Sequence, residues 1–148
     1  MLRIFARFLR MNTNTEPCSG KAKLLLEIQS PIQASNFIVG LMPETKEIEE
    51  PDFYRSASKQ TLETLINALH ILDKPYTLQD IYSILTSQEK ILNLRKELNA
   101  NHSNSPETHA YNSLVNRYTT AHGFDIMELR LNIAGLIGRI HSLIQTTE

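Results

Sequence analysis

The chain has 148 residues, of which 41% are hydrophobic and 21% charged, and its formal net charge is -1. This composition is typical of a globular domain with one core, and the near-zero charge excludes a strong overall attraction to nucleic acid or acidic lipid. The single cysteine, Cys18, excludes an internal disulfide and a zinc site built from cysteines alone. A chain without an internal disulfide fits a reduced setting, so we expect a cytoplasmic protein. No apolar run approaches the ~20 residues of a membrane-spanning helix.

Residues 1–10, MLRIFARFLR, interleave three arginines with apolar side chains. They fit a membrane-surface anchor, an organelle-type targeting peptide, or translated upstream sequence before a start at Met11. We favour the third, because ten residues make few lipid contacts and a polar linker follows. The predicted organisation is a basic segment and flexible linker over residues 1–20, dispensable for folding, and a single all-α domain over residues 21–148.

The next segments differ in how clearly they predict structure. Residues 21–28, KAKLLLEI, fit a short strand or a helical turn equally well. A helix is predicted from Pro31 to about Met42, with proline at its tolerated first position and Pro43 ending it. Residues 44–52 form an acidic loop. We interpret it as solvated rather than as a divalent-metal site, because it lacks an oxygen-ligand spacing such as that of an EF-hand loop.

A long helix is predicted to begin at Asp52. Its apolar residues recur at the three-and-four spacing of an amphipathic helix. They are Phe53, Ala57, Leu62, Leu65, Ile66, Leu69 and Leu72. The pair Lys74-Pro75 ends this helix, because the residue before a proline is pushed out of the α region.

A second, shorter helix follows. Thr77 is a suitable N-cap, with Asp80 in the first turn. The apolar face of this helix consists of Leu78, Ile81, Tyr82 and Leu85. The two helices and their corner form an αα-hairpin over about residues 52–86, and we predict that the other segments pack around it.

This hairpin resembles part of a known family. The similar stretches are Phe-Tyr-Arg at 53–55, Ala-Leu-His-Ile-Leu at 68–72, Lys-Pro-Tyr-Thr-Leu-Gln-Asp-Ile-Tyr at 74–82 and Leu-Thr-Ser at 85–87. They resemble type IV secretion coupling proteins, hexameric membrane-anchored ATPases that feed DNA or protein into a conjugation machine. The similarity is to their all-α domain, a helical insertion in the RecA-like motor. It spans roughly residues 31–145 in helix order, and its specific part is 52–87; the family's motor motifs are absent.

Two further helices are predicted before residue 123. Ser87 caps the first, QEKILNLRKEL. Its inward residues are Ile91, Leu94 and Leu98. Pro106 opens the second after a polar loop. Its inward residues are Ala110, Leu114, Val115 and Tyr118. Gly123 is predicted to act as the helix-ending glycine.

Asp125 is predicted to cap a long C-terminal helix over about residues 125–145. Its apolar residues recur at intervals of three and four. They are Ile126, Leu129, Ile133, Leu136, Ile140 and Leu143. Because the repeat is shorter than three heptads, burial in the core is preferred over a dimer seam. The sequence therefore predicts an all-α compact bundle of about five to six helices, built on the central hairpin and this helix.

The sequence contains no recognisable catalytic motif. It has no GxxxxGK[ST] phosphate-binding loop, and its scattered histidines form no HExxH pair. Cys18 lies in a linker without a basic partner to activate it, and no serine has a recognisable base. We therefore predict no enzymatic activity, no cofactor and no metal site.

Six basic residues are candidate nucleic-acid contacts. They are Arg55, Lys59, Lys90, Arg95, Lys96 and Arg117. Ordinary solvated charge is the simpler interpretation, and a local basic face that touches phosphates is the functional one. The resemblance favours the second, because the family's all-α domain sits at the cytoplasmic mouth of the motor, where it is thought to meet DNA and the relaxase-bearing substrate complex.

The resemblance thus implies a non-catalytic substrate-recognition domain that docks DNA or protein, either stand-alone or part of a longer coupling protein. The expected partners are DNA, bound weakly and without sequence preference, and a relaxase, another secretion substrate or the coupling-protein motor. Such partners would hold the protein in the cytoplasm or at the periphery of the inner membrane. The alternative is an unrelated helical adaptor that binds other proteins.

Overall fold

The structure, a computed structural model, describes residues 51–146 together with Asn36 and Gly40, which are both helical. Within these residues there are six helices and one two-stranded hairpin. In chain order they are α4 (Pro51–Ile71), α5 (Leu78–Leu85), α6 (Gln88–Asn101), α7 (Pro106–Arg117), β1 (Thr119–Thr120), β2 (Gly123–Phe124), α8 (Ile126–Asn132) and α9 (Ala134–Thr146). The all-α prediction is confirmed.

Several predictions concern residues outside this part of the chain. They are the basic segment and linker over 1–20, the undecided segment 21–28, most of the helix over 31–42 and the acidic loop up to residue 50. None of the described helices combines the length and apolar character needed to cross a membrane.

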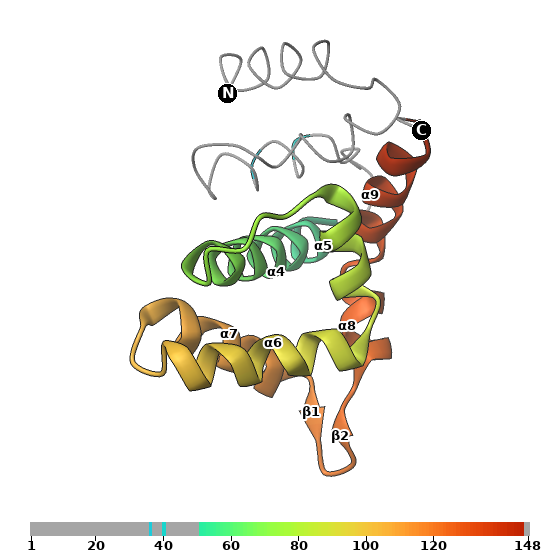
Figure 1. The fold of residues 1–148 in the computed structure, drawn as a ribbon. Coiled ribbons are helices and arrows are strands. Elements are labelled where there is room, and N and C mark those ends of the chain that lie inside the picture. Colours follow the sequence, from blue (N-terminus) through green and yellow to red (C-terminus); the bar gives the residue numbers. More distant parts are fainter. Residues whose placement is uncertain (1–35, 37–39, 41–50, 147–148) are drawn as a thin grey trace, which may run out of the picture.

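Helix α4 is the centre of the described fold. It contacts α7, α8 and α9, whereas α5 contacts α6 and α9. In Figure 1, α6 and α7 run below α4, and the β1–β2 hairpin protrudes at the bottom. The largest fully buried side chains are Leu62, Leu65, Ile66, Leu78, Ile81, Leu98, Tyr111, Leu129, Ile133 and Leu136. One apolar core thus joins residues from α4 to α9, as expected if the other segments pack around the hairpin.

The corner between α4 and α5 is built by local hydrogen bonds. The Lys74 N–H donates to the Leu69 carbonyl (3.1 Å) and the Asp73 N–H to the His70 carbonyl (3.0 Å), which is a Schellman motif. Asp73 takes the left-handed conformation that this motif requires, with φ 55°. The helix therefore stops at Ile71 through Asp73, before the Lys74-Pro75 signal that the sequence suggested.

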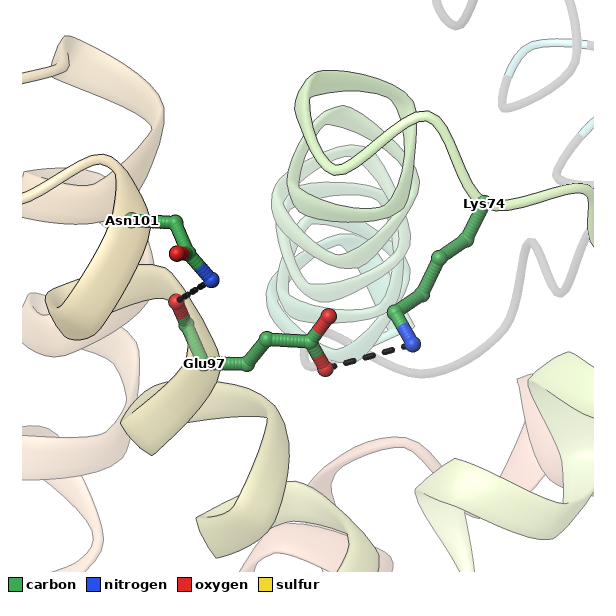
Figure 2. Close-up of polar contacts among 3 residues, drawn as sticks. All are labelled: Lys74, Glu97 and Asn101. Atoms are coloured by element: carbon green, nitrogen blue, oxygen red, sulfur yellow. Dashed lines mark hydrogen bonds and ion pairs between the residues drawn. The ribbon is translucent and has the colours of Figure 1, made fainter.

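Two further contacts hold the corner. Figure 2 shows Lys74 reaching across to Glu97 on α6, with Nζ 3.2 Å from Oε1. Both side chains are well exposed, so this pair contributes less than about 1 kcal/mol. The predicted cap of α5 is confirmed: Thr77 Oγ1 accepts from the Asp80 N–H (3.0 Å), and the Asp80 carboxylate accepts from the Thr77 N–H (2.9 Å).

Replacing Asp73 with glycine should stabilise the protein by about 0.5–1 kcal/mol. Glycine enters the left-handed region without the steric cost of a side chain, and this gain exceeds its larger entropy in the unfolded chain. Urea unfolding of Asp73→Gly beside Asp73→Asn provides the measurement, because asparagine also tolerates this conformation and should change little. A glycine variant that unfolds at lower urea than the parent would contradict the assignment of this corner.

On α4 and α7, some of the residues that are buried differ from those predicted to face inward. Phe53 was expected to face inward but is 60% exposed, because it lies nine residues, or about two and a half turns, before buried Leu62. On α7, Ala110 is exposed and Tyr111 is buried instead. The stripe of α7 is centred between Leu114 and Val115, and Tyr111 lies on it. By contrast, Ile91, Leu94 and Leu98 of α6 are all buried, as predicted.

Gly123 does not end a helix. Helix α7 stops at Arg117, and an antiparallel hairpin follows in which Thr119 pairs with Phe124 and Thr120 with Gly123. Gly123 has φ +106°, so the sequence located a position that requires glycine but assigned it to the wrong structure. The hairpin reverses the chain and brings Asp125 under Tyr118, whose carbonyl accepts from the Asp125 N–H (2.7 Å).

The predicted C-terminal helix is divided at Ile133, where φ is −120° and ψ is 25°. Asp125 caps α8 as predicted, accepting from the Glu128 N–H (3.1 Å). Asn132 precedes the break, and its side chain donates to the Tyr118 hydroxyl (3.0 Å). Asparagine at this position and Gly135 in the first turn of α9 are both weak helix formers. The predicted core role is confirmed for its central residues. Leu129, Ile133, Leu136 and Ile140 are buried.

Candidate functional site

The basic residues on α4 lie one turn apart on one flank. Arg55 is half-buried and Lys59 is exposed. The Lys59 Nζ lies 3.9 Å from Glu63 Oε1, which is a loose and exposed ion pair. The Glu63 carboxylate therefore lies beside these two cations, and its negative charge weakens their attraction for phosphate.

The three basic residues on α6 do not share one face. Lys90 donates to Ser83 Oγ on α5, and Lys96 is exposed on the outer side. At 100° per residue, Lys90 and Arg95 lie about 140° apart around the helix. Arg95 is half-buried. The structure thus distributes the six predicted contacts over three helices, α4, α6 and α7.

Arg95 lies close to the buried Tyr111. The Tyr111 hydroxyl donates to the Ile91 carbonyl (2.8 Å), which links α7 to α6. Burial raises the pKa of Tyr111 well above its usual value, and the nearby Arg95 opposes this rise. Arg95 therefore lies near the Tyr111–Ile91 hydrogen bond, which joins two helices of the core.

Arg117 lies in a cleft formed by α4, the end of α7 and α8. Its Nη1 donates to Gln60 Oε1 on α4 (3.1 Å), which holds the guanidinium across the gap. The cleft has a volume of about 520 Å³. It is lined by Phe53, Ser56, Ala57, Gln60, Arg117, Tyr118, Glu128 and Asn132. Of the six basic residues named from the sequence, Arg117 is the one that lines this cleft.

The cleft combines apolar and polar walls. Phe53 is 60% exposed and packs edge-on against Tyr54, with ring centroids 5.2 Å apart. Tyr118 is buried, and its hydroxyl accepts from Asn132. Glu128 supplies a carboxylate on α8, yet no ion pair joins it to Arg117 in the described part of the chain. The cleft therefore carries separate positive and negative groups beside an exposed aromatic ring.

Helix α8 adds two exposed apolar side chains. Met127 is 60% exposed and Leu131 is 65% exposed, and they lie one turn apart on the same face. Sequence reasoning missed them as surface residues. The available signal was that both fall between the positions of the three-and-four repeat, since a large apolar residue off the buried stripe of a short helix must face solvent.

A second cleft lies at the α4–α5 corner and has a volume of about 350 Å³. Its two lysines, Lys74 and Lys90, already contact Glu97 and Ser83. Residues 51–146 hold no cluster of three His, Cys, Asp or Glu side chains that could bind a metal ion. His70 is exposed, and His141 stacks on Tyr82 with ring centroids 5.4 Å apart.

Comparison with protein-family models, with curated proteins and with solved structures finds no match.

Proposed function

We propose that this chain is a non-catalytic substrate-recognition domain that docks a protein segment in the cleft between α4, α7 and α8. The role is the one implied by the resemblance of residues 52–87 to the all-α domain of coupling proteins. The observation that carries it is the exposure of Phe53 at this cleft, with Met127 and Leu131 exposed on α8. Exposed large apolar side chains near a polar cleft are characteristic of protein-docking surfaces.

The residues of the cleft favour docking over catalysis. Its lining supplies the Ser56 hydroxyl and the Glu128 carboxylate but no imidazole or thiol, and no hydrogen bond joins that hydroxyl to that carboxylate. Its charged groups, Arg117 and Glu128, come from different helices and form no ion pair with each other. Arg117 and Glu128 can orient a bound protein segment by hydrogen bonds. An apolar side chain of that segment can be buried against the exposed ring of Phe53.

A photo-crosslinking amino acid at position 53 tests this function in the cells that encode the chain. Benzoylphenylalanine replaces Phe53 with little change of shape, and the matched control carries it at Asn93, which is exposed on α6. We expect position 53 alone to cross-link to a relaxase, another secretion substrate or a coupling-protein motor. A specific partner unrelated to secretion would favour the helical adaptor. Equal cross-linking from both positions, or none, would refute the docking cleft.

DNA contact is the second candidate function, and the flank that carries Arg55 and Lys59 is the observation in its favour. Because the net charge is -1 and only six basic side chains are candidate contacts, they can neutralise only a few phosphates. We expect an affinity in the non-specific range of roughly 10⁻⁴ to 10⁻⁶ M that falls with added salt. Fluorescence anisotropy of labelled single- and double-stranded oligonucleotides measures it. Reversing Arg55 and Lys59 together, or Arg95 and Lys96 together, should weaken it. No signal at low salt and high protein concentration would exclude this function.

A further inference from the structure

We propose that the cleft between α4, α7 and α8 binds a peptide carboxylate that is flanked by an apolar or aromatic side chain. Arg117 and Tyr118 would donate hydrogen bonds to the carboxylate, and Phe53 would pack against its neighbour. The occupant is therefore an acidic segment of a protein partner. This inference rests on the proposed docking function and names the chemistry of the segment that docks.

Among the described residues, the guanidinium of Arg117 is held in place by a neutral partner and has no carboxylate paired with it. Its hydrogen-bond partner is the neutral amide oxygen of Gln60, at 3.1 Å from Nη1, and no carboxylate pairs with it within residues 51–146. A guanidinium has five N–H donors, so one bond to Gln60 leaves most of them for a ligand. Its planar fork matches the two oxygens of a carboxylate, and a charge-assisted pair of this kind is stronger than a neutral hydrogen bond.

Tyr118 provides a second donor in the same cleft. Its side chain is only 5% exposed, and its hydroxyl accepts from Asn132 Nδ2 at 3.0 Å. No described residue accepts a hydrogen bond from this hydroxyl, whose proton therefore has no protein acceptor there. A buried hydroxyl that lacks an acceptor gains from a ligand oxygen. The cleft thus offers two donors, one of them charged, from neighbouring positions in the chain.

The other walls select a peptide rather than a nucleic acid. Phe53 and Ala57 give the cleft an apolar side, which suits an aromatic or aliphatic neighbour of the carboxylate. Glu128 would repel a chain of phosphates, whereas a peptide can place a backbone N–H against it. The lining holds one cation, Arg117, and one carboxylate, Glu128, so the cleft suits a single ligand carboxylate placed at Arg117 rather than a polyanion.

The smallest probe that carries both groups is N-acetyl-L-phenylalanine. It is titrated into the ¹⁵N-labelled full chain, and the control is its carboxamide, which keeps the ring but loses the charge. We expect saturable amide shifts at the start of α4, at Arg117 and along α8 with the carboxylate probe alone. Arg117→Gln should weaken the probe about tenfold, the effect of losing one charge-assisted bond. Tyr118→Phe should weaken it severalfold, and Lys74→Gln, beyond the opposite end of α4, should leave it unchanged.

Three results would overturn the proposal. The first is equal binding of the carboxamide and the carboxylate. The second is unchanged binding of the carboxylate probe in both Arg117→Gln and Tyr118→Phe, provided that Tyr118→Phe melts like the parent. The third is that a ten-nucleotide oligothymidine shifts the same amides more strongly than the probe does. The last would show a phosphate site. These results are independent of the cross-linking at position 53. Specific cross-linking without carboxylate preference would remove only the ligand chemistry, whereas absent cross-linking would remove the docking function itself.

Discussion

Leu136→Asp should unfold the domain or lower its stability by at least about 4 kcal/mol. Leu136 is fully buried near the start of α9, in the core shared with α4. The change removes an apolar side chain and leaves an unpaired carboxylate at a fully buried position. Domains of this size are stable by only about 5–15 kcal/mol, so a loss of this magnitude removes most of the stability of a domain near the lower end of that range.

Leu131→Asp is the matched control for this experiment. It makes the same chemical change one helix earlier, at a side chain that is 65% exposed, and should alter stability by no more than about 0.5 kcal/mol. Far-UV circular dichroism during thermal melting compares both variants with the parent. If Leu136→Asp melts like the parent, the α9 stripe is not a core element. Sedimentation would then test whether that stripe is a dimer seam instead.

Raising the pH above 10 should destabilise the protein, and Tyr111→Phe should reduce this effect. Burial raises the pKa of Tyr111 above the value near 10 that it has in an unfolded chain. Above pH 10 the unfolded state loses the phenol proton that the folded state keeps. The stability due to this group is therefore complete below pH 10, and falls by about 1.4 kcal/mol per pH unit until the folded pKa is reached.

The phenylalanine variant isolates this contribution. At neutral pH it loses the hydrogen bond to the Ile91 carbonyl, which costs about 1 kcal/mol. Its stability should then decline less steeply than that of the parent in urea titrations between pH 9 and about 12. Some decline remains, because burial also raises the pKa of Tyr76. Identical slopes for parent and variant would show that Tyr111 ionises as freely in the folded state as in the unfolded one.

The sequence alone was sufficient for the starts of most helices. Thr77, Ser87 and Asp125 were named as N-caps, and in each case the side chain accepts from the backbone N–H three residues later. A cap is a contact within one turn, so the residues that decide it are adjacent in the chain. The buried stripe of α6 was equally readable, because its three inward residues keep one helical period.

The candidate site was only partly predictable. Arg117 was named, but as a phosphate contact, and Phe53 was placed in the core. Gln60 and Glu128 were not singled out, because each is an ordinary polar residue on the exposed side of its own helix. Their importance comes from the cleft that they share with Arg117 and Tyr118.

Tertiary structure decided where the chain bends and which residues meet. The hairpin after Tyr118 directs α8 toward the first half of α4, and the break at Ile133 separates α8 from α9. Neither follows from the apolar period of the segment. The bond between Arg117 and Gln60 joins residues 57 positions apart. Local spacing predicts which side of a helix is buried, because that depends on one helical period. It does not predict a contact between two outer faces, since that depends on the packing angles and turns of every element between them.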